Sequence, residues 1–215
     1  TIIYGTQEWT VENACHITYR DGTPIPQVVN SWDWRGLNTG AWCYYDNNIN
    51  NGVLYNWHAV MGIHDAASLS NPSLRKEFAP EGWHVPSDAE WTTLEEYLIA
   101  NGYNYDETTE GNKIAKAISS QSGWLSNSTT DFGNPAYNQE NTNNSSGFNI
   151  PPTGYRATST SMFDFQWQGL TADVWTSTEH SDGLAFYRNL DRNEVSINRY
   201  YALLRHGYSV RLVKD

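Results

Sequence analysis

The sequence predicts a single α+β domain with two helices, antiparallel strands and long ordered loops. A helix is expected over residues 87–98, and short strands separated by turn signals follow residue 174. Aromatic residues make up 14% of the 215 residues, yet the mean hydropathy is only −0.64, because Asn, Ser, Thr and Gly are abundant. This composition is typical of short strands, long ordered loops and an aromatic-rich surface.

The helix over residues 87–98 has a defined start and one apolar face. Ser87 can serve as its N-cap, and Glu90, three residues later, can complete a capping box. The apolar stripe follows the spacing i, i+3, i+7 and consists of Trp91, Leu94 and Leu98. We therefore expect this helix to pack by one face onto a large part of the domain.

Three further elements are predicted on either side of this helix. Residues 3–11 alternate in polarity and predict a hairpin, and residues 53–60 fit either a strand or a short helix. Residues 111–121 predict a second, shorter helix. The polar tract over residues 122–149 is a long loop, and loops of this length in compact domains are usually functional or internally stabilised.

The C-terminal part of the chain predicts an antiparallel meander. Its strands are expected at residues 174–179, 185–190, 195–202 and 208–213. An Asp-Arg-Asn turn at residues 191–193 separates the second strand from the third. The last strand is expected to be buried, with Val210 and Leu212 alternating against Arg211 and Val213.

Net charge and apolar patterning narrow the possible partners. A charge of −11 argues against a nucleic-acid partner, because binding to phosphates needs a basic surface. No run approaches the roughly 18 apolar residues of a membrane span. No signal segment is visible at Thr1, and the Asn- and Trp-rich composition with few lysines favours an exported, trimmed protein. Cys15 and Cys43 permit one disulfide in an oxidising compartment, and the sequence leaves their pairing open.

The sequence contains no pattern that predicts catalysis or a cofactor. None of the six histidines has the spacing of a metal site such as HExxH, so neither a metal nor another cofactor is predicted. His84 is expected to be a structural hydrogen-bonding residue. No GxSxG-type context supports a catalytic nucleophile, so the chain is not expected to be an enzyme.

The aromatic residues divide into a predicted core and a predicted surface. Residues in strand or helix patterns are expected to be buried, namely Trp9, Trp57, Trp83, Trp91 and Trp175. The better candidates for exposure are Trp167, Tyr187, Tyr200 and Tyr201.

Several motifs in order along the chain resemble those of one family. They are GVLYNWHAV (residues 52–60), APEGWHVPSDAEW (79–91), GYR (154–156), WTSTE (175–179) and GYSVRLVKD (207–215). With them the chain resembles the Fibrobacter succinogenes major paralogous domain over nearly its whole length. The resemblance implies a C-type-lectin-like fold, distantly similar to formylglycine-generating enzyme domains. It also implies an exported, cell-surface protein of Bacteroidetes-type bacteria, whose C-terminal meander presents the ligand-binding face.

The resemblance also extends to variable proteins that are diversified by retroelements, in which the stretch between the last two motifs is rewritten. The corresponding window here is residues 180–206. Residues 180–215 contain six basic and four acidic residues, a net charge of +2, whereas the rest of the chain carries −13. Tyr and Arg are mixed in this window, as in recognition surfaces. The candidate ligand-binding residues are His180, Asp182, Phe186, Tyr187, Arg188, Asp191, Asn193, Ser196, Asn198, Tyr200, Tyr201, Leu203, Arg205 and His206.

The favoured prediction is therefore a non-enzymatic recognition module, an adhesin or receptor-binding protein for an unidentified protein or glycan. The alternative is a calcium-dependent lectin or an enzyme whose site lies in the loop over residues 122–149. The calcium-binding triplets of sugar-binding C-type lectins are absent, and Leu212 stands where many family members carry Cys. Loop carboxylates that could still hold a cation are Asp131, Asp164, Asp173 and Glu179. The oligomeric state is left open.

Overall fold

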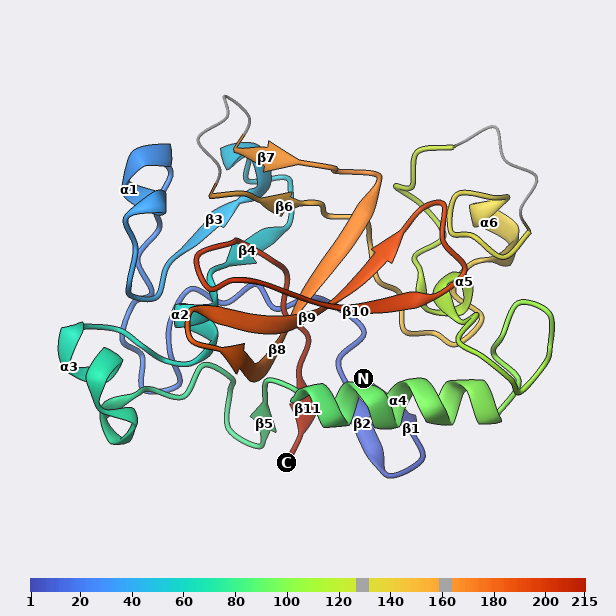
Figure 1. Ribbon diagram of the computed structural model, residues 1–215, viewed down its shortest axis with the longest axis horizontal. Coiled ribbons are helices and arrows are strands. Elements are labelled where there is room, and N and C mark those ends of the chain that lie inside the picture. Colours follow the sequence, from blue (N-terminus) through green and yellow to red (C-terminus); the bar gives the residue numbers. More distant parts are fainter. Residues whose placement is uncertain (127–131, 159–163) are drawn as a thin grey trace.

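The computed structural model describes residues 1–126, 132–158 and 164–215. A three-stranded antiparallel sheet lies at the centre, with one long helix, α4, along one side of it (Figure 1). Within the described residues the α-helices are α1 (Ser31–Arg35), α2 (Trp57–Val60), α3 (Ala66–Ser70), α4 (Asp88–Ala100), α5 (Ala115–Ile118) and α6 (Gln139–Thr142). Two 3₁₀ turns occupy Tyr45–Asn47 and Pro72–Leu74. The predicted α+β class is confirmed, whereas the C-type-lectin-like fold remains a prediction.

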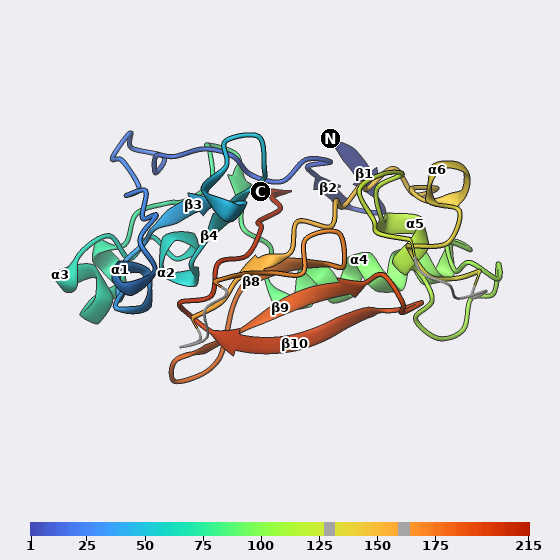
Figure 2. The same cartoon turned by 90° about the horizontal axis from the view of Figure 1, so that it is seen from above.

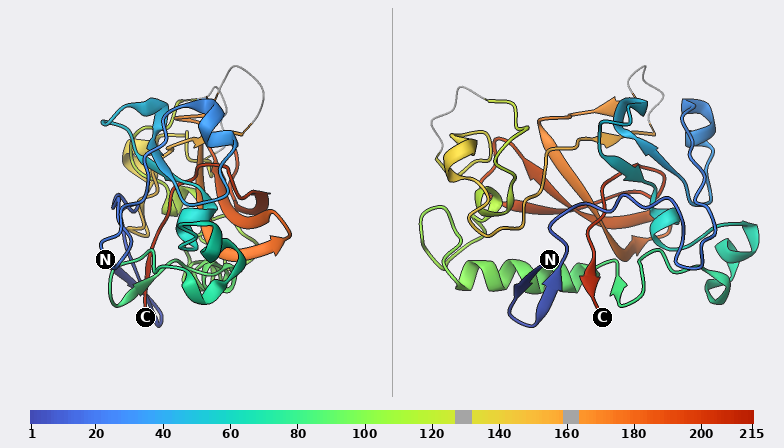
Figure 3. Two further views of the ribbon diagram at one scale, coloured as in Figure 1. Left: turned by 90° about the vertical axis from the view of Figure 1, so that its left-hand side faces the viewer. Right: turned by 180° about the vertical axis from the view of Figure 1, so that it is seen from behind.

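The strands form four sheets in the described part of the chain. The central sheet has the order β10-β9-β8 and consists of β8 (Thr171–Ser181), β9 (Leu184–Asp191) and β10 (Ile197–Leu203). A second sheet has the order β1-β2-β11-β5 and consists of β1 (Ile2–Tyr4), β2 (Gln7–Trp9), β11 (Val213–Lys214) and β5 (Trp83–His84). The two smaller sheets pair β3 (Trp42–Tyr44) with β4 (Val53–Tyr55), and β6 (Tyr155–Arg156) with β7 (Phe165–Gln166). The second sheet therefore joins the two ends of the chain beside α4 (Figure 3).

The local predictions with strong sequence signals are confirmed. The N-terminal hairpin forms between β1 and β2, and the meander of β8, β9 and β10 is antiparallel throughout. At the start of α4 the Ser87 side chain accepts from the backbone N–H of Glu90, and the Ser87 N–H donates to Glu90 Oε2 at 2.7 Å. The segment over residues 53–60 contains both of its predicted alternatives, because β4 ends at Tyr55 and the side chain of the next residue, Asn56, caps α2.

The helix α4 anchors one of the hydrophobic clusters of the core. Trp91, Leu94 and Leu98 are all buried, as the stripe predicted. The Trp91 ring lies 4.9 Å from that of Trp9, centroid to centroid, and 5.7 Å from that of Phe148. The helix therefore connects the N-terminal hairpin to the end of the long loop. Of the tryptophans expected in the core, Trp83 is partly exposed, and that prediction is wrong.

Two other predictions need correction, and the pairing of the cysteines, which the sequence left open, is answered. The second helix is confined to Ala115–Ile118, because the preceding segment is held as an irregular loop: Asn104 accepts from the N–H of Lys113, and Asn112 accepts from the N–H of Ile197. The segment over residues 208–213 is buried as expected, but the alternation is absent and the last strand, β11, is confined to Val213–Lys214 outside the central sheet. It runs between the sheets, and the fully buried Arg211 donates to the backbone carbonyls of Thr10, Phe148 and Asn149. Cys15 and Cys43 are free thiols, the first exposed and the second buried.

Candidate functional site

The predicted window lies on the central sheet, whose register arranges side chains in rows across the strands. On one face, a row consists of Trp175, Tyr187 and Tyr200. On the other face, the adjacent row consists of Val174, Arg188 and Arg199. We call the first the aromatic face, and the second the helix face because α4 lies against it (Figure 2).

On the helix face Arg188 is enclosed by residues of α4. Its side chain is 1% exposed, and it donates to Asp88 Oδ1 at 2.6 Å and to Glu95 Oε1 at 2.5 Å. A third bond reaches Thr92 Oγ1 at 3.2 Å. Arg188 therefore has no free surface for a ligand, contrary to its place in the predicted binding set, because two acidic residues of the helix bind it.

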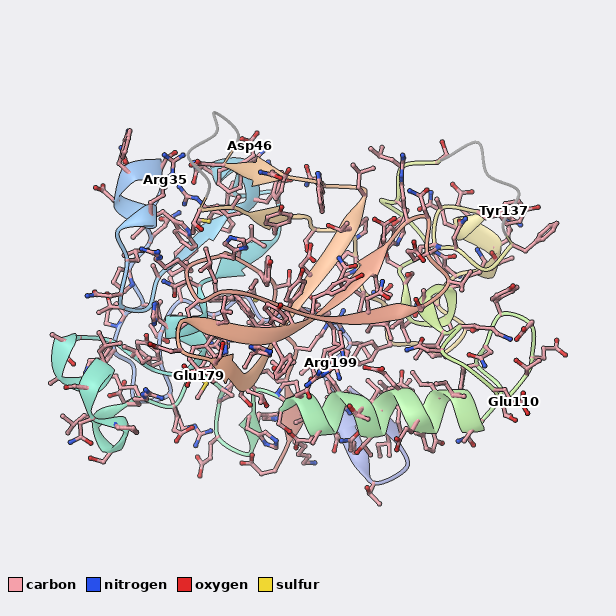
Figure 4. The ribbon with its side chains drawn as sticks, in the orientation of Figure 1. Arg35, Asp46, Glu110, Tyr137, Glu179 and Arg199 are labelled. Atoms are coloured by element: carbon pink, nitrogen blue, oxygen red, sulfur yellow. The ribbon has the colours of Figure 1, made fainter. Side chains whose placement is uncertain are left out.

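Arg199 shares the acidic partner of Arg188 but remains half exposed. Its guanidinium binds Asp88 through both carboxylate oxygens, at 2.8 and 2.9 Å, and lies 3.7 Å above the ring of Phe186. Figure 4 shows Arg199 between β10 and α4. The predicted excess of positive charge in the window is thus largely neutralised by carboxylates elsewhere in the chain.

The two carboxylates of this network respond differently to their surroundings. Burial raises the pKa of Glu95, and the guanidinium of Arg188 does not reverse that shift. Burial alone would also raise the pKa of Asp88, but hydrogen bonds from Arg199 and Arg188 outweigh it and lower that pKa. The lowered pKa favours the ionised form of Asp88, which pairs with both arginines.

The aromatic face carries a continuous group of rings. The Tyr187 ring lies 4.6 Å from that of Tyr208 and 6.1 Å from that of Tyr200. Tyr208 also contacts Tyr155 at 5.6 Å, and the Tyr155 ring stacks on His206 at 5.9 Å. These separations are typical of favourable aromatic pairs, so each ring limits the motion of its neighbours.

Trp167 extends this group beyond the sheet. Its indole lies 5.5 Å from the Tyr155 ring and is 52% exposed. The backbone of Trp167 has a φ of 65°, which is uncommon for a large side chain. The chain passes so close to Gly154 here that a Cβ on that glycine would lie 2.3 Å from the carbonyl oxygen of Gln166. The surrounding backbone thus holds Trp167 in a strained, outward position.

A buried carboxylate lies beneath these rings. Asp173 accepts from the Asn189 side chain and from Thr171 Oγ1, both at 2.8 Å. Burial raises the pKa of Asp173 to about 6. Asp173 is therefore a buried residue of β8, which corrects the expectation of a loop carboxylate. Glu179 likewise lies in β8, at its exposed end.

A smaller aromatic cluster lies on the helix face, two residues along the strands from the arginines. His180 stacks on Tyr201 at 4.2 Å and contacts the Phe186 ring at 4.8 Å. Tyr201 is 55% exposed, and Tyr200 on the opposite face is 50% exposed. The predicted exposure of both tyrosines is confirmed, because β10 is the last strand of the sheet and both of its faces reach solvent.

The comparison with protein families agrees with the motif pattern. A family model described as the Fibrobacter succinogenes major domain matches residues 2–214. The chain belongs to this family. No curated protein and no solved structure matched. Membership alone assigns no activity, so the function has to be inferred from the site.

In this Fibrobacter succinogenes major domain the other predicted residues lie at the two ends of the sheet. Asp182 is in the exposed turn between β8 and β9. At the opposite end, Asp191 accepts from the backbone N–H of Asn193 at 2.8 Å, and Ser196 donates to Asn198 at 3.1 Å. Leu203, Arg205 and His206 follow at the end of β10. The window therefore does not converge on one pocket but spreads over both faces of the strands.

Some members of the aromatic face were not among the predicted site residues. Tyr155 and Tyr208 belong to the motifs GYR and GYSVRLVKD, which lie outside the predicted window. Trp167 was expected to be exposed, and it is, but nothing in the sequence connected it with the sheet. The pairing of Tyr155 with Gln166 in β6 and β7 brings them together. The sequence signal that could have linked Tyr155 with Tyr208 is that each of them directly follows a glycine at the start of its motif.

The described residues contain no group of three His, Cys, Asp or Glu side chains placed to hold a metal ion. Asp164 instead binds Arg35 at 3.2 Å and Arg156 at 3.3 Å. Asp131 lies outside the described residues. His84 has the predicted structural role, because its two ring nitrogens lie 2.7 Å from Glu90 and from Asp215. No helix within residues 1–126, 132–158 and 164–215 is both long and apolar enough to cross a bilayer.

Proposed function

We propose that this domain is a non-enzymatic recognition module that binds a protein or glycan through the outer surface of β9 and β10. The observation that carries the proposal is the aromatic face, where exposed rings are fixed by buried ones. Tyrosine and tryptophan provide large contact areas with little loss of conformational entropy, and they are enriched at binding hot spots. The proposed contact residues on this face are Trp167, Tyr155, Tyr187, Tyr200 and His206.

The residues beneath the aromatic face form a buried framework that holds the exposed rings in place. Asp173, Asn189 and Trp175 lie beneath the rings and are buried. The Trp175 indole N–H donates to the backbone carbonyl of Tyr55 at 2.9 Å, which connects the face to β4 in the small β3–β4 sheet. A face held in this way can bind with little rearrangement.

The proposal includes an exported, surface-displayed protein whose window is diversified. The structure sharpens the pattern that diversification would follow. Substitutions should occur at exposed positions such as Tyr200, Tyr201 and Arg205. Arg188 and Asn189 should stay constant, because Arg188 is itself buried in its ion pairs with α4 and Asn189 binds the buried carboxylate of Asp173. Sequencing copies of this domain from one genome tests this expectation. Differences spread evenly over buried and exposed positions would contradict it.

Binding through the aromatic face is tested with glycan and protein arrays. We expect Tyr200→Ala and Trp167→Ala to abolish any signal of the wild-type domain. The matched control is Tyr105→Ala, because Tyr105 is also an exposed tyrosine but lies outside this face. If Tyr105→Ala abolishes the signal and the other two variants retain it, the aromatic face is not the binding site.

A second candidate site is a cavity of about 410 Å³ beside the long loop, lined in part by Tyr105, Lys116, Phe132 and Tyr137. Lys116 is buried, and burial lowers the pKa of its ammonium to about 8. Binding lost in Lys116→Met and retained in Tyr200→Ala would favour this alternative. If no calcium site exists, a chelator leaves the melting temperature unchanged, since a bound ion stabilises the folded state that holds it.

A further inference from the structure

The outer edge of β10 is open in the described structure. The central sheet ends with this strand, and Figure 2 shows no helix or strand beyond it. An edge strand exposes a row of backbone donors and acceptors that only another extended chain can satisfy in full. Which of these groups point outward follows from the hydrogen bonds on the far side of the sheet.

The hydrogen bonds of β8 show which residues of each strand direct their backbone N–H and C=O groups toward which neighbour; we call this alternation the phase. The Trp175 N–H donates to the Ser209 carbonyl, and the Ser209 N–H donates to the Asp173 carbonyl, both at 3.0 Å. Asp173 and Trp175 therefore direct their backbone groups away from β9, so it is Val174 that faces Arg188 across the β8–β9 ladder. Asn189, the next residue, then faces β10.

The register carries this phase across to β10. Asn189 pairs with Asn198, Tyr187 with Tyr200 and Ala185 with Ala202. The backbone groups of Asn198, Tyr200 and Ala202 are therefore used within the sheet, and those of the residues between them point outward. The outward set consists of Arg199, Tyr201 and Leu203.

A separate contact at the start of β10 gives the same result. The Asn112 side chain bonds to the N–H of Ile197 at 3.2 Å and to its carbonyl at 3.1 Å. Ile197 is two residues before Arg199, so its outward direction matches the phase derived from β8. Asn112 thus occupies the first outward position of the edge and leaves the next ones free.

The open part of the edge has defined limits. Within the described residues no hydrogen bond reaches the backbone N–H of Arg199, Tyr201 or Leu203, or the carbonyls of Arg199 and Tyr201. The Leu203 carbonyl accepts from the N–H of His206 at 2.9 Å, where the chain turns. The free segment therefore lies between the Asn112 side chain and this turn.

We propose that this edge binds an extended segment of another protein, which adds to the central sheet as a fourth strand. The inference rests on the proposed recognition function and names the class of partner, a peptide in β conformation. Such strand addition takes affinity from backbone hydrogen bonds and specificity from the flanking side chains. Tyr200 flanks the edge on the aromatic face, and Tyr201 and Leu203 flank it on the helix face. The segment should therefore carry apolar or aromatic side chains on both of its faces and no proline at the paired positions.

The alternative occupant is a second copy of the domain, and two observations disfavour it. Each copy carries a net charge of −11, and like charges oppose association. The free edge is also limited to residues 199–203. Pairing of two such short edges buries far less than the roughly 1,600 Å² of a standard protein interface.

A phage-displayed library of random linear peptides tests the proposal directly. Clones are selected on the wild-type domain, and their synthetic peptides are then compared on Tyr201→Pro and Tyr201→Ala. Both variants lose the tyrosine ring, but only proline removes the outward N–H. Proline is tolerated at edge positions whose N–H faces solvent. We expect peptides to bind Tyr201→Pro at least about tenfold more weakly than Tyr201→Ala. Equal affinities for the two variants, or no enriched peptide, would overturn the proposal.

Amide hydrogen exchange of the wild-type domain gives a second test that needs no variant. In the free protein the amides of Arg199, Tyr201 and Leu203 should exchange fast, and those of Asn198, Tyr200 and Ala202 slowly. A selected peptide should slow the first set. If the first set is already protected in the free domain, the edge is closed and the inference fails.

The failure of this inference can be separated from failure of the proposed function. A glycan or folded protein that binds wild type and Tyr201→Pro equally, but not Tyr200→Ala, leaves the aromatic face as the site and removes strand addition. Loss of binding in Tyr201→Pro alone, with Tyr200→Ala unaffected, keeps strand addition and removes the aromatic face.

Discussion

The two faces of the central sheet use their large polar side chains in opposite ways. On the helix face, the guanidinium of Arg188 is held by Asp88 and Glu95 and is withdrawn from solvent. On the aromatic face, Tyr187 and Tyr208 hold each other, and Tyr200 beside them reaches solvent. Arginine and tyrosine are both frequent in binding surfaces, yet of these two positions only Tyr200 is placed to contact a partner.

The comparison shows that the acidic residues of α4 determine which residues of the window are free to contact a partner. Arg188 becomes part of the framework because its charge is buried, and leaving a buried charge unpaired is very unfavourable. An aromatic ring needs no oppositely charged partner, so one part of it can pack in the core while another part is exposed to solvent. The helix face is therefore the support of the sheet, and the aromatic face is its recognition surface.

The largest effect is expected from removing the anchor of α4 itself. Trp91→Ala should reduce the free energy of unfolding by about 3–5 kcal/mol, because it leaves a cavity against Trp9 and Phe148. That is a large share of a total of roughly 5–15 kcal/mol. Thermal melting measures it, with Trp32→Ala as the control, since Trp32 is 77% exposed. A shift of only one or two degrees in Trp91→Ala would mean that α4 is not anchored through this residue.

A smaller but still large effect is expected for the buried arginine. Arg188→Ala should lower the free energy of unfolding by about 3 kcal/mol, because it leaves Glu95 buried without its partner. The control is Arg199→Ala, which removes a half-exposed arginine of the same network and should cost less than about 1 kcal/mol. Denaturant unfolding at neutral pH compares the two. Equal losses would contradict the expectation that Arg188 contributes more to stability than Arg199.

The third expectation concerns how the buried carboxylate beneath the aromatic face, Asp173, makes the stability of the domain depend on pH. The pKa of Asp173 is raised from 3.8 to about 6, so the folded state favours the protonated carboxyl. Its contribution to stability is fully present below about pH 4, is lost as the pH rises through about 6, and is constant above. The total change is about 3 kcal/mol, since one pKa unit corresponds to about 1.4 kcal/mol.

Asp173→Asn tests this expectation, because it removes the titration and keeps a side chain of similar shape. The free energy of unfolding of the wild type, minus that of the variant, should fall between pH 4 and pH 7. Taking the difference cancels the other carboxylates, such as Asp88, whose lowered pKa acts in the opposite direction. A difference that is independent of pH would show that Asp173 is ionised in the folded protein throughout this range.

The parts of the structure that the sequence predicted are those with local causes. The cap of α4 depends on Ser87 and Glu90, three residues apart, and the apolar stripe on residues within two turns. The hairpin and the meander likewise depend on neighbouring strands and the turns between them. Patterns of this kind are complete within a short window, so they can be identified without knowledge of the fold.

The candidate site was predicted only in outline, because the burial of its residues has distant causes. Arg188 is buried by residues about a hundred positions earlier in the chain, and a strand pattern contains no trace of them. Tyr155 and Trp167 join the site through the short pairing of β6 with β7, which no strong sequence signal marks. The exposure of both Tyr200 and Tyr201 depends on the position of β10 at the edge of the sheet, which is a property of the topology.

The smallest effect on stability, with the largest effect on binding, is expected at the outer surface. Replacing Tyr200, Tyr201 and Arg205 together with Ala should change the free energy of unfolding by less than about 0.5 kcal/mol per residue, because all three are exposed. The same variant should lose binding to any partner of the domain, since hot spots concentrate in tyrosine and arginine. Thermal melting and array binding are measured on the same preparation.

The two halves of this prediction fail in different ways. Tyr200 touches Tyr187, and Tyr201 stacks on His180, so a stability loss of several kcal/mol would mean that these contacts hold the sheet together. The aromatic face would then be support as well, and its contrast with the helix face would disappear. Unchanged binding at unchanged stability would instead move the site away from β10. In that case the cavity beside Lys116 becomes the place to look for the partner, because it is the candidate on this chain that depends on neither face of the sheet.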